Sequence, residues 1–172
     1  MNEIILKQAG PEAGNLLQQL GKRTFYETFA ESNDEETIQN YLERSFSPEK
    51  VLQELSNPDS YFFIAYEQDT AVGYLKLNTA KAQTELQGNS ALEIERIYVL
   101  KDFHGKKVGQ LLFEKAIGIA RQLNKEFIWL GVWEQNTMAV RFYEKNGFMA
   151  FDTHVFKMGD EEQTDILMKK IL

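Results

Sequence analysis

Residues 92–110 hold the densest group of side chains that could take part in chemistry. The stretch LEIERIYV at 92–99 alternates in the manner of a strand, and a short loop with Gly105 joins it to an amphipathic segment that begins at Val108. A strand, a tight loop and a helix N-terminus together present unpaired N–H groups and the positive end of a helix dipole, which suit a phosphate group. Lys106 and Lys107 add positive charge. The pattern predicts either a phosphate-binding loop or a capped helix whose lysines are only solvated.

Two carboxylates in the same predicted strand could accept a proton. Glu93 and Glu95 lie two residues apart, so both side chains leave the same face of an extended chain. A carboxylate whose pKa lies above its usual value is a suitable proton acceptor near neutral pH. The alternative interpretation is a pair of solvated carboxylates on a strand.

A second group of acidic residues lies closer to the N-terminus. Glu27, Glu31 and residues 34–36 cluster in a segment with helical spacing, and several carboxylates together can hold a cation. A run of charge is also typical of a solvated helix face. His154 and residues 159–162 either line the pocket in which those carboxylates would hold a cation or form a surface turn. No spacing typical of metal ligands appears, so no metal site is predicted.

The elements that would position these residues follow from hydrophobic periodicity and turn residues. Apolar residues at helical spacing predict helices, and short aromatic or aliphatic runs predict strands. The expected helices are 11–30, 34–44, 47–55, 108–123 and 136–146, with Ser47-Pro48 starting the third and Gly147 ending the last. The expected strands are 3–7, 61–66, 72–77, 92–100, 127–133, 148–157 and 164–171, with a polar loop at 79–90. This order predicts an α/β protein whose mixed sheet is flanked by helices.

Length and composition limit the class of protein. The 172 residues fit one domain, 1–172, and the content of 43% apolar and 26% charged residues is typical of soluble globular proteins. The formal net charge is −7, which disfavours nucleic-acid binding and attracts cations. The sequence has no cysteine, no apolar run of membrane-spanning length and no leader-like N-terminus. We therefore expect a cytoplasmic protein with neither nucleic acid nor membrane as a partner.

Two motifs resemble the GNAT superfamily of acetyltransferases. The loop His104-Gly105-Lys106-Lys107-Val108-Gly109 is similar to the family's motif A, Arg/Gln-x-x-Gly-x-Gly/Ala, although His104 replaces Arg/Gln and Lys107 replaces the middle glycine. The segment NTMAVRFYEKNGF at 136–148 resembles the family's N-x-x-A-x-x-F-Y-x-x-x-G-F motif and follows an apolar strand that ends at Trp133. Core packing with a helix C-cap would explain the second motif alone. The two motifs in this order and spacing favour the family.

A closer resemblance extends over nearly the whole chain. LEIERIYV at 92–99, WLGVWE at 129–134 and MGDEEQTD at 158–165 look like the bacterial PaiA-type polyamine N-acetyltransferases, which act on spermidine and spermine. The resemblance implies the GNAT fold, a mixed sheet of about seven strands with a splayed parallel pair and helices on both faces. It also implies acetyl-CoA as co-substrate, no metal and a small amine as partner, and it allows a homodimer.

The resemblance also implies roles for individual residues. Tyr143 matches the family tyrosine near the CoA sulfur and is expected to protonate the leaving thiolate, while Glu95 is expected to be the base, with Glu93 as its substitute or co-ligand. Backbone N–H groups of residues 97–99 are expected to polarise the thioester carbonyl. The expected cofactor contacts are Ile97, Tyr98, Val99, His104, Gly105, Lys106, Lys107, Val108, Gly109, Gln110, Asn136 and Tyr143. The expected acceptor contacts are Glu27, Glu31, Glu95 and Trp133.

Other functions fit the same motifs. An acetyltransferase for a protein N-terminus, an amino acid or an antibiotic amine would share them. A regulatory protein that binds acetyl-CoA with little turnover also fits, because the phosphate loop departs from the family pattern. Release of thiol that depends on an added amine distinguishes these alternatives.

Overall fold

A sheet of seven strands forms the centre of the computed structural model, which describes residues 2–85 and 88–172. The strand order is β1-β2-β3-β4-β5-β7-β6, and all neighbours are antiparallel except β4 and β5. The strands are β1 (Ile4–Ala9), β2 (Ser60–Glu67), β3 (Thr70–Asn78), β4 (Ala91–Val99), β5 (Phe127–Trp133), β6 (Met149–Met158) and β7 (Glu161–Ile171). The predicted mixed sheet is confirmed.

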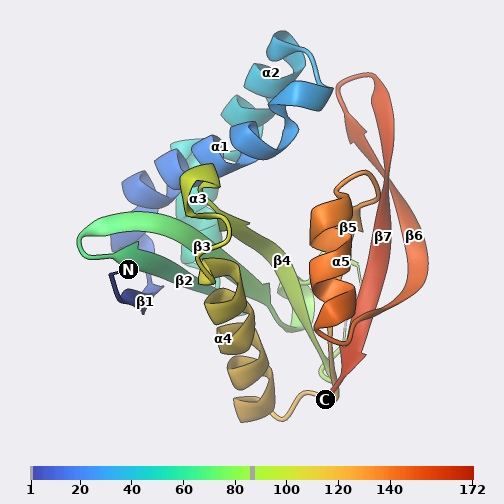
Figure 1. Ribbon diagram of the computed structural model, residues 1–172. Helices are drawn as coiled ribbons and strands as arrows, with labels where there is room; N and C mark the ends of the chain where they lie inside the picture. Colours follow the sequence, from blue (N-terminus) through green and yellow to red (C-terminus); the bar gives the residue numbers. More distant parts are fainter. Residues whose placement is uncertain (1, 86–87) are drawn as a thin grey trace.

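The parallel strands β4 and β5 separate after a short paired region. Only Ala91–Glu93 of β4 pair with Phe127–Trp129 of β5, although the strands are nine and seven residues long. Figure 1 shows the sheet as two halves that meet near the C-terminus and diverge toward α1 and α2. The remaining backbone groups of β4 on this side have no β5 partner in the described ladder. The splayed pair that the resemblance implied is therefore present.

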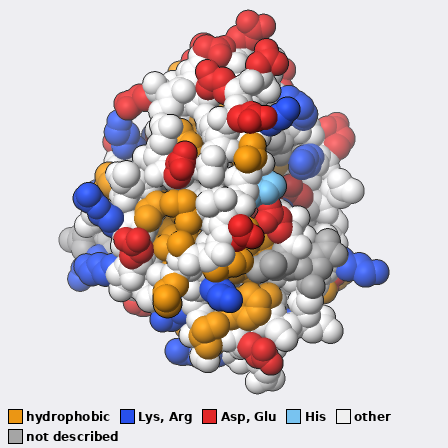
Figure 2. Space-filling view, turned by 90° about the vertical axis from the view of Figure 1, so that its right-hand side faces the viewer, with side chains coloured by type: hydrophobic (Ala, Val, Ile, Leu, Met, Phe, Trp, Pro, Cys, Tyr) orange, Lys and Arg blue, Asp and Glu red, His pale blue; other side chains and the backbone are white. Residues whose placement is uncertain are grey.

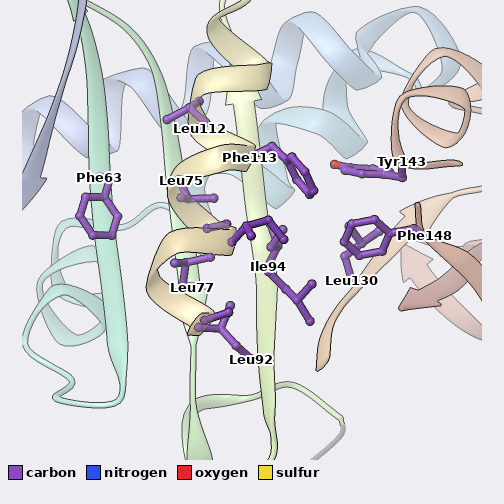
Figure 3. Close-up of a cluster of buried hydrophobic side chains, with 14 of the residues drawn as sticks. Phe63, Leu75, Leu77, Leu92, Ile94, Leu112, Phe113, Leu130, Tyr143 and Phe148 are labelled. Carbon is purple, nitrogen blue, oxygen red and sulfur yellow. The ribbon is translucent and has the colours of Figure 1, made fainter. Parts of the chain in front are cut away.

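Helices cover both faces of the sheet, as predicted. On one face lie α1 (Gly14–Phe29), α2 (Glu35–Ser45) and α3 (Pro48–Leu55), whose apolar residues pack with Phe62, Ile64 and Tyr74. On the other face lie α4 (Val108–Gln122) and α5 (Thr137–Lys145). Figure 3 shows the second core, in which Phe113 of α4 and Tyr143 of α5 lie over the side chains of the central strands. Burial on both faces explains the almost continuous apolar sequence of β5.

Capping residues fix where several elements begin and end. The Ser47 side chain accepts a hydrogen bond from the Lys50 N–H, so α3 starts where Ser47-Pro48 predicted. Gly147, with φ of 91°, follows the end of α5 as expected. The last strand begins at Glu161 rather than at 164, because Gly159, with φ of 63°, closes a tight turn.

The described residues of the connection from β3 to β4 contain little regular structure. A single short helical turn, η3 (Ala80–Ala82), interrupts the loop that was predicted at 79–90, and residues 86–87 of that prediction lie outside the described residues. In the described part of the chain, no helix combines the length and the apolarity needed to cross a membrane.

Candidate active site

A cavity of about 370 Å³ lies on the α1–α2 face of the sheet, where β4 and β5 separate. Side chains from α1, α2, β4, β5, β6 and β7 line it, together with Thr84 and Glu85 of the loop before β4. Its aromatic lining includes Phe25, Phe29, Tyr41, Trp133 and Phe156. Its ionisable lining includes Glu85, Glu93, Glu95, Arg96, His154 and Asp165. An aromatic cavity with several carboxylates suits an organic cation.

Alternate residues of β5 form one wall of this cavity. Trp129, Gly131 and Trp133 project to the same side of the strand, and Gly131 is the exposed member of an otherwise largely buried run. The Trp133 ring packs at 5.4 Å from Phe29 of α1. The Trp133 Nε1–H is buried and has no hydrogen-bond partner among the described residues. Trp133, predicted to contact the acceptor, therefore lies in the cavity wall.

A β-bulge in β4 brings two neighbouring ionisable side chains close to Lys76. Ile94 pairs with Leu77 and Ile97 pairs with Leu75, so Glu95 and Arg96 together stand opposite Lys76 of β3. The Lys76 Nζ lies 2.5 Å from Glu95 Oε2 and 3.3 Å from Glu54 Oε2. Arg96 donates two hydrogen bonds to Glu54 of α3, at 2.9 and 3.2 Å. Two cations and two carboxylates thus form one mostly buried network.

Glu93 lies beside this network but is held by neutral groups. Its Oε1 accepts a hydrogen bond from the Thr84 hydroxyl, and its Oε2 accepts one from the Thr84 N–H at 2.9 Å. The Asn78 side-chain amide donates to both Glu93 and Glu95, at 3.0 and 2.7 Å. The two carboxylates therefore share one donor, which confirms that their side chains lie on the same side of the sheet.

The two carboxylates differ in acidity. Burial raises the pKa of Glu93 against the hydrogen bonds from Thr84 and Asn78, which lower it. Burial also acts to raise the pKa of Glu95, but the charges of Arg96 and Lys76 and the hydrogen bonds from Lys76 and Asn78 lower it overall. The raised pKa that suits a proton acceptor therefore belongs to Glu93, whereas the ion-pair network stabilises the charged form of Glu95.

Tyr143 projects from α5 into the core on the opposite face of the sheet. Its ring packs at 5.5 Å from Phe142 and 5.7 Å from Phe148, and the residue is 7% exposed. Figure 3 shows the phenol oxygen pointing toward Phe113 of α4. Burial raises the pKa of Tyr143 above its ordinary value, so the phenol stays protonated across the neutral range.

The loop before α4 has the geometry of an anion-binding turn. Gly105 and Lys107 both adopt left-handed backbone conformations, with φ of 79° and 64°, and Lys107 is the N-cap of α4. Successive turns of this kind, followed by the free N–H groups of a helix start, form a concave site for an anion. A Cβ at Gly105 would meet nothing within 4 Å, so the loop surface there is open. The Lys106 ammonium lies over the Phe103 ring at 4.7 Å.

The left-handed conformation of Lys107 leads to a stability prediction. The free energy of unfolding of Lys107→Gly is expected to exceed that of Lys107→Ala by about 1 kcal/mol, because only a residue with a Cβ is strained at positive φ. Lys107→Gly should therefore unfold at a higher denaturant concentration. Gly118 of α4 provides the matched control, since its environment has room for a Cβ. Gly118→Ala should instead stabilise the protein by up to about 1 kcal/mol. Equilibrium unfolding in urea measures both, and equal midpoints for the two Lys107 variants would contradict the strain argument.

The other residues predicted to contact the cofactor surround this loop or the separated strands. The His104 Nε2 donates to the Val99 carbonyl at 2.8 Å, and so carries the ring proton. Gln110 donates to Asn146 at 3.1 Å, which links α4 to the end of α5. Asn136 is the N-cap of α5 and accepts from the Ala139 N–H at 3.3 Å. Ile97, Tyr98 and Val99 lie in β4 beyond its pairing with β5, and Val108 and Gly109 form the first turn of α4.

Two carboxylates that were predicted to contact the acceptor lie outside the cavity lining. Glu27 accepts a hydrogen bond from the Lys101 N–H at 2.7 Å and pairs with Arg23. Glu31 is exposed in the short turn after α1. Acidic side chains also gather at the top of the face in Figure 2, at the end of the molecule where α2 lies. The cavity instead receives Glu85 and Asp165, which the sequence analysis did not select, and His154, which it left open.

Comparison with known proteins finds a matching family model and several similar acetyltransferases. The family model described as acetyltransferase (GNAT) family matches residues 17–148. The chain is 40% identical over 153 residues to an uncharacterized N-acetyltransferase in the pepI 3′ region of Lactobacillus delbrueckii subsp. lactis, covering 89% of this chain and 88% of that protein. It is 28% identical over 171 residues to a spermidine N(1)-acetyltransferase of Thermoplasma acidophilum, covering 97% and 96% of the two chains.

A solved structure shares the whole fold. The PaiA N-acetyltransferase of Thermoplasma acidophilum, solved in complex with coenzyme A, superposes with a TM-score of 0.81 at 26% identity and covers 99% of each chain. Around this fold the chain has a loop with two left-handed residues before α4, a buried phenol on α5 and a cavity lined by carboxylates on the other face of the sheet.

Proposed function

The chain belongs to the acetyltransferase (GNAT) family, and on that premise we propose that it transfers the acetyl group of acetyl-CoA to a primary amine of a small polycation, with spermidine and spermine as candidate acceptors. The observation that carries the proposal is the cavity at the β4–β5 split, whose lining contains four carboxylates, Glu85, Glu93, Glu95 and Asp165. The relative named for spermidine acetylation, which aligns over nearly the whole chain, supports the choice of acceptor.

The residues around the split fit acetyl-CoA. The left-handed turns at Gly105 and Lys107 and the first N–H groups of α4 would hold the pyrophosphate, and Lys106 and Lys107 would balance its charge. The unpaired edge of β4 at residues 97–99 offers backbone groups to the pantetheine arm. When bound, acetyl-CoA supplies a thioester carbonyl that an amine can attack. Backbone N–H groups of residues 97–99 would stabilise negative charge on that carbonyl oxygen.

The proton to be removed comes from the acceptor. An alkyl ammonium like that of lysine has a pKa near 10.4, so it must lose a proton before its nitrogen can form a bond. Glu93 is the better proton acceptor because its pKa is raised, while Glu95 remains an anion that attracts the ammonium group. The C–N bond forms as the C–S bond breaks, and the sulfur takes its proton from the Tyr143 hydroxyl. The newly bonded nitrogen gives up its second proton, which restores the phenol through solvent.

The test is thiol release from acetyl-CoA in the presence of spermidine, spermine, lysine or a peptide with a free N-terminus. We expect release that depends on spermidine or spermine and exceeds that with lysine or the peptide. Release with the peptide alone would replace the polyamine assignment by an N-terminal acetyltransferase. CoA binding without release by any amine would favour a regulatory protein.

A further inference from the structure

Asp165 is a carboxylate of the cavity that no described residue contacts through a hydrogen bond or ion pair. Burial raises its pKa, although the nearby His154 acts to lower it. The carboxylates of Glu93 and Glu95 accept hydrogen bonds from Asn78, and Glu85 pairs with His154 at 2.5 Å. Among the described residues, no hydrogen-bond donor or cation pairs with the Asp165 carboxylate, although the residue is partly buried. A partly buried carboxylate without a partner is a costly arrangement, and a bound cation would relieve it.

Gly131 keeps this carboxylate open to the cavity. A Cβ at Gly131 would lie 3.6 Å from the Asp165 Oδ2 and 3.4 Å from the Leu167 Cδ2. Any longer side chain at this position would therefore extend over the carboxylate. A glycine in the interior of a strand weakens the strand and often marks a close approach by another molecule. The sequence of β5 thus has a gap where the acceptor could reach β7.

Asp165 also lies across β5 from the two central carboxylates. Glu93 and Glu95 belong to β4, on one side of β5, whereas Asp165 belongs to β7, on its other side. Two strand spacings of roughly 4.8 Å separate β4 from β7 where all three strands pair, and the distance grows where β4 and β5 diverge. All three of Glu93, Asp165 and the intervening Gly131 line the same cavity. The cavity therefore has two separate anionic ends.

We propose that Asp165, left uncovered by Gly131, binds a second cationic nitrogen of the acceptor while the first lies at Glu93 and Glu95, so that the site selects diamines and polyamines over monoamines. The proposal rests on the proposed function, since it assigns an acceptor to the same cavity. His154, the register partner of Asp165 on β6, supports it by pairing with Glu85 and leaving Asp165 available. The distinguishing group is a positive charge at the far end of the acceptor.

The experiment measures acceptor binding and turnover separately. Calorimetric titration with spermidine in the presence of CoA gives the Kd, and thiol release with 1,4-diaminobutane or butylamine gives the KM for a diamine and its matching monoamine. Asp165→Asn is expected to raise the spermidine Kd and the diamine KM by about 10- to 100-fold and to leave the butylamine KM unchanged. Asp152→Asn is the matched control, because it removes the same charge from the neighbouring strand outside the cavity lining.

Gly131→Ala provides a second variant that the fold tolerates, because its Cβ would make only ordinary contacts. Gly131→Ala should raise the spermidine Kd by a larger factor than it raises the butylamine KM. Equal spermidine binding by wild type and Asp165→Asn, or no binding by either, would overturn the proposal. Spermidine binding that depends on Asp165 without any thiol release would instead support the subsite and refute the proposed reaction.

Discussion

Tyr143→Phe is expected to lower kcat by about 10²- to 10⁴-fold, the usual contribution of a positioned acid or base. The substitution removes one oxygen and keeps the ring that packs between Phe142 and Phe148. The raised pKa of Tyr143 means that wild type holds this proton at every pH at which the enzyme would be assayed. The loss should therefore be independent of pH in the neutral range. Thiol release at saturating spermidine and acetyl-CoA measures it.

The control for Tyr143→Phe removes the phenol oxygen of a tyrosine outside the proposed active site. Tyr26 of α1 lies outside the cavity lining and donates to Glu35 at 2.9 Å, so Tyr26→Phe deletes a hydroxyl with a known partner away from the proposed chemistry. Its kcat should stay within about twofold of wild type. Thermal unfolding of both variants separates lost chemistry from lost folding. A folded Tyr143→Phe protein with wild-type kcat would refute the role of the phenol as the acid.

Local sequence signals predicted most of the framework. Helix starts such as Ser47-Pro48 and Asp34 carry their own capping groups, so their positions depend on only a few neighbouring residues. The apolar run of β5 and the amphipathic spacing of α4 likewise specify each element and its buried side. The loop before α4 was recognisable because its glycine and helix start adjoin in sequence.

The ion-pair network could not be predicted in this way. Arg96 binds Glu54, which is 42 residues earlier, and the bulge that turns Arg96 toward Lys76 depends on the register between β3 and β4. Simple alternation places Glu93 and Glu95 on one face but gives no partners for either. The pKa of Glu95 is set by those distant partners, so the pattern of the strand alone could not show which of the two carboxylates has the raised pKa.

The acceptor end of the cavity was missed for a related reason. In the order β5-β7-β6, the last strand of the chain, β7, lies between β5 and β6. Asp165 reaches the cavity only through this arrangement, and nothing next to it in sequence indicates a pocket. The acidic residues near α1 and α2 appeared more promising because they cluster in sequence. Two of them, Glu27 and Glu31, lie outside the cavity lining.

Glu93→Gln is expected to lower kcat/KM by about 10²- to 10⁴-fold at neutral pH. It should also abolish the decrease in kcat/KM that wild type shows as the pH falls. In wild type the carboxyl group must be ionised to accept a proton, and its pKa lies above the ordinary glutamate value because the side chain is 3% exposed. Activity is therefore present above this raised pKa and is lost as the pH falls through it. This acid limb of the pH profile of kcat/KM should have its midpoint at a higher pH than the ionisation of an exposed glutamate would give. The dependence of kcat/KM on pH, measured by thiol release, locates it.

Glu95→Gln distinguishes the two carboxylates. This variant leaves Lys76 and Arg96 with Glu54 as their remaining carboxylate partner in the network, so it should reduce the free energy of unfolding and raise the KM for spermidine. The acid limb should persist, because Glu93 still titrates. Loss of the limb in Glu95→Gln and its retention in Glu93→Gln would reverse the assignment. Glu95, despite its lowered pKa, would then be the base, and Glu93 would serve to hold Thr84 and the loop before β4 against the sheet.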